Sequence, residues 1–240
     1  MTWHENLEDF GKELEPGSTF RFECHPKLTC FGMCCSTEIT LTPYDIARMR
    51  RHLNIETGEF LSTYCKVYTD PRTGFPFVLL KNKEDGKCIF LGSHGCSRYE
   101  SRPSCCRNYP LARVIDNDDN SDKRLTIYYL QQEATYCEGL GRGSDRTVGE
   151  YCEMNGLIPY EKANDLFLDI PFAYKRLSHS VRHDSEVQSM VFGAVFNFDA
   201  FFAKYGRFNH VSAPKDDHEM IVLVRGIALN LIKKSARFHP

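Results

Sequence analysis

The sequence predicts an α+β fold in two unequal parts: a small cysteine-rich metal-binding domain of short strands and helices over residues 1–145, and a helical region over residues 146–240. Nine of the eleven cysteines lie before residue 110, and none follows Cys152. Short apolar runs bounded by turn residues fill the first part, whereas apolar residues recur at offsets of three and four in the second. Whether the two parts pack as one unit is left open.

A helix is expected directly after the first cysteine cluster. Thr42 can cap it and Pro43 suits its first turn. An apolar face then follows at helical spacing, formed by Ile46, Met49 and Leu53. A second short helix is expected over residues 56–65 and a turn over residues 70–74.

Three short strands are expected in the first part. Residues 77–80 and 88–91 are apolar runs on either side of a polar turn. Residues 125–130 are rich in β-branched and aromatic side chains, which favours a strand. An acidic loop over residues 116–122 precedes this last strand.

The second part is expected to be helical from about residue 144. Pro171 should break or kink the helix expected between residues 160 and 180. A final helix is expected over residues 217–235. Between these two helices the sequence predicts one apolar helical face that ends near Gly206, formed by Val187, Met190, Val191, Ala194, Phe198, Phe201 and Phe202.

Charge and hydropathy exclude several classes of partner. A net charge of -2 and a pI near 6.5 give no basic field for nucleic acid. The longest apolar stretch, residues 220–232, is interrupted by Arg225 and Asn230 and is shorter than the roughly 20 residues that span a bilayer. The acidic N-terminus resembles no secretory signal. We therefore expect a cytoplasmic protein with no nucleic-acid or membrane partner.

The cysteines favour bound metal over disulfides. Their number is odd, and two pairs are adjacent in sequence, Cys34 with Cys35 and Cys105 with Cys106. A chain of this length builds a core without covalent staples. Cytoplasmic thiols also stay reduced, so zinc, iron or an iron–sulfur cluster is the preferred interpretation.

Cys30, Cys34 and Cys35 form a compact C-x3-C-C group in which Gly32 lets the backbone curl. Adjacent cysteines point in different directions, so they reach different irons of one cluster or two different centres more easily than a single ion. A second group, Cys88, Cys96 and Cys106, lies on turns and a helix start. The nearby Arg98, Arg102, Arg107 and Arg113 either offset thiolate charge or are solvated; both alternatives stay open.

Several segments resemble one known family. They are Phe22-x-Cys24, Cys30-x3-Cys34-Cys35, residues 39–46, 86–91, 95–99 and 102–110, and Cys137-Glu138-Gly139-Leu140-Gly141. In order and spacing these blocks resemble the zinc- or iron-chelating cysteine-cluster family, the CxxxCxxCC or YkgJ-like proteins. The resemblance covers about residues 20–145.

The resemblance implies eight metal ligands: Cys24, Cys30, Cys34, Cys35, Cys88, Cys96, Cys106 and Cys137. The spare thiols are then Cys65, Cys105 and Cys152. The spacing departs from the family at Cys24, where five residues precede Cys30 instead of two or three. His25 or His94 is therefore an alternative ligand.

The implied cofactor is an iron–sulfur cluster or a zinc or iron ion, with a redox, sensing or metal-handling role. The alternative function is an iron–sulfur-dependent protein lysine N-methylase resembling flagellin methylase, which would add a protein substrate. The glycines at 139, 141 and 143 resemble an S-adenosylmethionine loop, but the preceding segment is polar and the next helix is expected only near Arg146, which favours a turn. No recognised catalytic arrangement decides whether the chain is an enzyme.

Overall fold

The computed structural model describes residues 11–117, 124–131, 136–205 and 214–238, and confirms the α+β class. The described strands form four small antiparallel sheets. The first has the order β1 (Lys12–Leu14), β9 (Arg124–Leu130), β8 (Leu111–Asn117). The second pairs β2 (Thr19–Phe22) with β10 (Leu140–Thr147). The third has the order β3 (Thr40–Leu41), β5 (Pro76–Leu80), β4 (Cys65–Thr69), and the last is the hairpin of β6 (Leu91–Gly92) and β7 (Gly95–Cys96).

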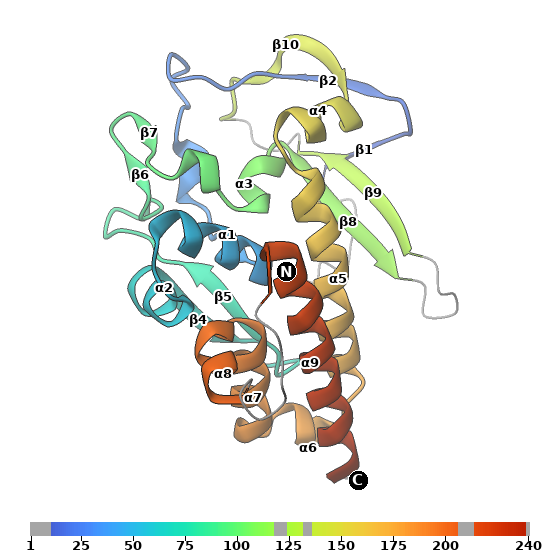
Figure 1. The fold of residues 1–240 in the computed structure, drawn as a ribbon. Helices are drawn as coiled ribbons and strands as arrows, with labels where there is room; N and C mark the ends of the chain where they lie inside the picture. Colours follow the sequence, from blue (N-terminus) through green and yellow to red (C-terminus); the bar gives the residue numbers. More distant parts are fainter. Residues whose placement is uncertain (1–10, 118–123, 132–135, 206–213, 239–240) are drawn as a thin grey trace.

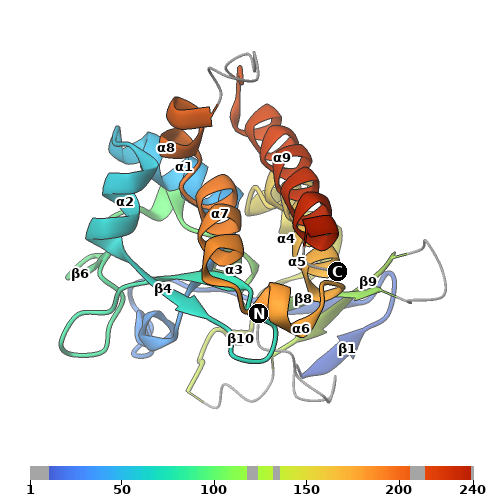
Figure 2. The ribbon, with the colours of Figure 1, turned by 90° about the horizontal axis from the view of Figure 1, so that it is seen from below.

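Helices make up most of the second half of the chain. The described α-helices are α1 (Pro43–Leu53), α2 (Thr57–Tyr64), α3 (Ser104–Asn108), α4 (Val148–Met154), α5 (Ile158–Lys175), α6 (His179–Arg182), α7 (Ser185–Val195), α8 (Phe198–Tyr205) and α9 (Asp217–Phe238). Two short 3-10 helices are η2 (Met33–Ser36) and η3 (Tyr99–Ser101). The long helices α5 and α9 pack against each other along one side, and α7 lies against α9 (Figures 1 and 2). Within these described ranges, no helix has both the length and the apolar character needed to span a membrane.

The main hydrophobic core takes residues from both parts of the sequence. Phe60, Val78 and Phe90 of the first part belong to the same buried cluster as Phe196 and Val224 of the second. The two parts therefore pack together, while the division at residue 145 stays a prediction.

Helix α1 begins where the sequence predicts. Thr42 accepts a hydrogen bond from the Asp45 N–H, and the Asp45 carboxylate accepts one from the Thr42 N–H, a complete capping box. The expected helix over 56–65 is confirmed as α2, and the expected strands over 77–80 and 125–130 as β5 and β9.

The strand expected over residues 88–91 is wrong for most of its length. Cys88 makes only an isolated bridge with Asn82, and the strand β6 begins at Leu91. The chain turns here, since the Leu91 N–H donates to the Cys88 carbonyl (3.0 Å). This turn leaves the Cys88 side chain at the start of the β6–β7 hairpin.

The helical region differs from the prediction at three places. The segment from Leu140 to Thr147 is strand β10, so the helix begins at Val148. Helix α5 continues through Pro171, which excludes the expected break, because the buried Phe167, Ile170 and Tyr174 hold the helix in the core against a cost of about 3 kcal/mol.

The single helical face expected over residues 187–202 is divided between two helices. The separation has a physical cause in α2: the Thr57 hydroxyl donates to the Asn197 side chain (3.0 Å), and the Asp199 carboxylate accepts from the Thr57 N–H (2.9 Å). These bonds fix a new helix start at Phe198. The predicted stop at Gly206 lies outside the described residues.

Candidate metal centre

Strands β2 and β10 bring together two cysteines far apart in sequence. Leu140 pairs with Phe22, and the Glu23 N–H donates to the Gly139 carbonyl (3.1 Å). Cys24 therefore follows the end of β2 close to Cys137, which precedes β10. Gly139 is required at this crossing, because a Cβ atom there would lie 2.5 Å from the Glu23 carbonyl oxygen.

Four of the predicted ligands line one surface pocket beside this crossing. The pocket has about 270 Å³ of space, part of it open to solvent. Its lining residues are Phe22, Cys24, Leu28, Cys30, Cys34, Tyr109, Tyr136, Cys137 and Gly139. This set of four pocket cysteines, Cys24, Cys30, Cys34 and Cys137, is called the pocket group below. The remaining wall is mostly aromatic or aliphatic, which lowers the local dielectric constant around the sulfur atoms.

The loop between β2 and η2 carries two members of the pocket group, Cys24 and Cys30. Gly32 adopts φ 83°, a left-handed conformation that a glycine takes without strain, and the 3-10 helix η2 then begins at Met33. Cys30 is buried, and its sulfur accepts a hydrogen bond from the Glu138 N–H (3.4 Å). The predicted role of Gly32 in curling the backbone agrees with this geometry.

The protonation of Cys24 and Cys34 reflects their neighbours. The pKa of Cys24 rises to about 11, first because of burial and then because of three nearby thiols, Cys34, Cys30 and Cys137. The pKa of Cys34 is lowered to about 7, because the Cys35 thiol hydrogen-bonds to its sulfur. The thiolate of Cys34 is therefore favoured over that of Cys24.

The other four predicted ligands lie at the edge of the main core. Cys88 is buried in that core, and the side chains of Cys35, Cys96 and Cys106 pack against it. Backbone contacts hold the set together: the Cys88 N–H donates to the Cys35 carbonyl (2.7 Å), and Cys96 pairs with Leu91 in the hairpin. These four, Cys35, Cys88, Cys96 and Cys106, are called the core group.

Backbone amides point at two sulfurs of the core group. Burial raises the pKa of Cys88 and of Cys96, and in each case a backbone N–H, from Phe90 and Arg98 respectively, hydrogen-bonds to the sulfur and opposes the rise. Both donors stand two residues after the cysteine. Hydrogen bonds of this kind stabilise a thiolate and tune metal sites built from thiolates.

Helix α3 carries Cys106 and is anchored by Asp45. The fully buried Asp45 carboxylate accepts hydrogen bonds from the Ser104 N–H (2.7 Å) and hydroxyl (3.1 Å), as well as from Thr42. Burial raises the pKa of Asp45, and these hydrogen bonds oppose the rise. The sequence motif contains Asp45, but its spacing shows only the helix cap and not the link to α3.

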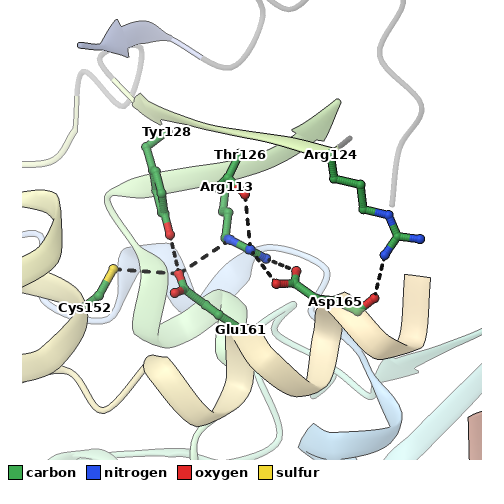
Figure 3. Close-up of polar contacts among 7 residues, drawn as sticks. All are labelled: Arg113, Arg124, Thr126, Tyr128, Cys152, Glu161 and Asp165. Carbon is green, nitrogen blue, oxygen red and sulfur yellow. Dashed lines mark hydrogen bonds and ion pairs between the residues drawn. The ribbon is translucent and has the colours of Figure 1, made fainter. Parts of the chain in front are cut away.

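The four arginines near the core group fall into two classes. Arg98 and Arg102 lie close enough to Cys96 for their charge to favour its thiolate. Arg107 donates instead to the carbonyls of Arg102 (3.0 Å) and Asn155 (2.8 Å). Arg113 donates two hydrogen bonds to Asp165 (2.8 and 3.1 Å), as Figure 3 shows.

The three spare thiols have surroundings of their own. The Cys152 sulfur contacts the Glu161 carboxylate (3.7 Å) within the polar network of Figure 3. Cys65 is buried at the start of β4, and burial raises its pKa to about 12. Cys105 is exposed and donates to the Thr40 carbonyl (3.8 Å). All eleven cysteines are free thiols.

The alternative histidine ligands lie apart from the pocket lining. The His25 Nδ1 accepts a hydrogen bond from the Lys27 N–H (3.2 Å), which stabilises the local turn. His94 is exposed at the tip of the β6–β7 hairpin. Cys24 lines the pocket, so the geometry favours it over either histidine.

The segment over residues 102–110 contains Tyr109, for which the sequence predicts no role. Its hydroxyl is buried beside the Cys137 side chain, and burial and the contact with Cys137 raise its pKa. A hydroxyl donor at this place fits a site whose occupant carries negative charge on sulfur.

The cysteine side chains of each group are neighbours, but they do not surround a single metal position. In the part of the chain that the structure describes, no three Cys, His, Asp or Glu side chains are arranged so that they could hold a metal ion. Metal binding therefore requires the sulfurs of a group to move closer together. The donor chemistry itself fits zinc and iron, for which thiolate is a preferred ligand.

The glycine-rich segment after Cys137 does not open a helix. Gly141 and Gly143 lie within β10, with φ 78° and 82°, where the pairing with β2 is interrupted between Leu140 and Asp145. The segment opens with the turn that the sequence predicts, in which the Arg142 N–H donates to the Gly139 carbonyl (3.3 Å), and it is not a nucleotide-binding loop between strand and helix.

The clustered thiols indicate a metal-binding class of protein. Comparison with known families agrees: residues 23–138 match the CxxCxxCC family model, described as "Putative zinc- or iron-chelating domain". The match is to the cysteine-cluster family that the motifs predict, and it supports general metal binding. No curated protein and no solved structure gave a match to the chain.

Proposed function

We propose that this chain binds zinc, iron or an iron–sulfur cluster through eight thiolates, those of the pocket group and the core group, and serves a redox, sensing or metal-handling role in the cytoplasm. The observation that carries the proposal is the pocket lined by Cys24, Cys30, Cys34 and Cys137, which come from two segments far apart in sequence, residues 24–34 and the residues just before β10. Convergence of cysteines from distant segments has no role in ordinary core packing.

The surroundings support metal over inert thiols. Amide N–H groups point at the sulfurs of Cys30, Cys88 and Cys96, and Arg98 and Arg102 add positive charge near Cys96. These contacts stabilise thiolates, which are the forms that bind metal. When bound, the metal would supply a charge that holds the loops together, or a redox centre if it is iron.

The test is metal analysis of protein purified without oxygen. Elemental analysis gives the amount of zinc and iron per chain, and a brown colour with broad visible absorbance identifies an iron–sulfur cluster. Protein that is bare of both metals, with its thiols intact, would contradict the proposal.

A single-residue test uses Cys34→Ala, with Cys152→Ala as the matched control. Cys34→Ala should lower metal content and solubility together, because site formation and folding are coupled. Cys152 lies in a different polar network, so its variant should keep the metal content of the parent. Unchanged metal content in Cys34→Ala would remove Cys34 from the ligand set.

A further inference from the structure

The geometry points to two separate four-thiolate centres, one formed by the pocket group and one by the core group, with the adjacent Cys34 and Cys35 supplying one ligand to each. This inference rests on the proposed function and adds to it the division of the ligands and the different exposure of the two centres. Each centre would have four sulfurs, the ligand number of a tetrahedral zinc ion or of a four-cysteine iron–sulfur cluster.

The first observation is that the two groups have different surroundings. Of the eight predicted ligands, only the pocket group lines the pocket. The core group is equally distinct, since Cys88 belongs to the main hydrophobic core and the other three pack against it, whereas no member of the pocket group takes part in that cluster. The pocket lining and the core cluster therefore divide the eight predicted ligands into the same two groups of four.

The second observation is how the backbone holds each group. The β2–β10 pairing and the Glu138 N–H contact to the Cys30 sulfur connect the segment that holds Cys24, Cys30 and Cys34 to the segment that holds Cys137. The Cys88–Cys35 hydrogen bond and the β6–β7 hairpin connect the core group, to which α3 adds Cys106. Two independent sets of contacts assemble the two groups.

Cys34 and Cys35 stand where the groups meet. They are consecutive residues of η2, and the Cys35 thiol hydrogen-bonds to the Cys34 sulfur, so the two groups are in contact at this point. Cys34 lines the pocket, whereas Cys35 packs against the core. The surroundings of the two neighbouring thiols therefore assign them to different groups.

The exposure of the groups predicts different behaviour. The pocket is open to solvent on one side, and Cys24 is exposed. The core group packs onto the main core, and none of its four cysteines is fully exposed. Closed four-thiolate sites are structural, so the core centre is assigned to stability, while the pocket centre is the one that solutes reach.

The test compares single and double variants by metal content after anaerobic purification. Cys137→Ala and Cys96→Ala should each retain about half of the parental metal. The double variant Cys30→Ala/Cys137→Ala, within one group, should match the Cys137→Ala variant. The double variant Cys96→Ala/Cys137→Ala, across the groups, should retain almost none. Cys65→Ala, outside both groups, is the control and should keep the full content.

A single shared centre predicts a different pattern, in which the two double variants lose the same amount. That result, in parental protein that does bind metal, would overturn the two-centre inference and leave the proposed function standing. Parental protein without metal would overturn both.

A second measurement covers variants that fail to fold. Parental protein is partly depleted with a chelator, alkylated in the native state and analysed by mass spectrometry. The cysteines of the pocket group should become reactive together while those of the core group stay protected. Simultaneous exposure of all eight would contradict two centres.

Discussion

Cys24 and His25 are neighbours in sequence with different surroundings, and they show what a single residue contributes to the site. The pKa of Cys24 responds to three other thiols, whereas His25 accepts a hydrogen bond within its own turn. Spacing alone left both as alternative ligands. Their neighbours in space distinguish Cys24 from His25. Those neighbours depend on the pairing of β2 with β10, which the spacing of the motif does not encode.

The first prediction concerns this pair. Cys24→Ala should lower metal content by up to half, because it removes one of four thiols around the pocket, whereas His25→Ala should leave it unchanged. Elemental analysis of both variants provides the check. The reverse order, with metal lost only in His25→Ala, would assign the ligand to the histidine.

Asp45 shows how one buried carboxylate links a helix start to a ligand-bearing helix. It accepts hydrogen bonds from both Thr42 and Ser104, so α1 and α3 share one acceptor. Asp45→Ala should lower the free energy of unfolding by about 3 kcal/mol, since buried donors lose their partner. Chemical denaturation measures the change.

The matched control is Glu150→Ala in the second capping box of the chain. Glu150 caps α4 with Thr147, but at the exposed surface and without a link to another helix. Its variant should lose less stability than Asp45→Ala. Equal losses in both would mean that the contact between Asp45 and α3 contributes nothing beyond the cap.

At the scale of elements, the pairing of β2 with β10 builds the pocket. The strands meet most closely at Gly139, where the Glu23 carbonyl leaves no space for a Cβ atom. Gly139→Ala should therefore push the strands apart and separate Cys24 from Cys137. Metal content should fall toward half although no thiol is removed.

Gly149→Ala is the control for that substitution. Gly149 lies in α4, where an added Cβ atom meets no other atom within 4 Å. Alanine also favours the helix by about 1 kcal/mol over glycine. The metal content of Gly149→Ala should stay at the parental level. Parental metal content in Gly139→Ala as well would show that the close approach of β2 and β10 at Gly139 is not needed for metal binding.

Local signals in the sequence predicted the elements that depend on local contacts. Thr42 and Pro43 gave the start of α1, and the β-branched run gave β9. The division between α7 and α8 depends on contacts with Thr57, about 140 residues away in sequence, so periodicity alone missed it. The sequence likewise indicated eight candidate ligands, which stay a prediction, but their division into two groups depends on the core and the pocket.

At the scale of the whole molecule, the two thiol groups relate differently to the hydrophobic core. The core group packs against a cluster that includes residues of α5, α7 and α9, whereas the pocket group comes from the chain between β2 and the end of η2 and from the segment just before β10. Loss of metal from the core group would therefore loosen packing throughout the molecule. Loss from the pocket group would affect only the loops around it.

The last prediction follows from this difference. During titration with a chelator, about half of the metal should leave first with little change in far-UV circular dichroism, because the helices do not depend on the pocket. The remaining metal should leave together with cooperative unfolding, since metal binding and folding are coupled at the core group. Metal release and helix content are measured on the same samples. In Cys137→Ala the first phase of metal release should be absent and the second phase unchanged. If the parental protein instead lost all of its metal in one step together with unfolding, both groups would depend equally on the core.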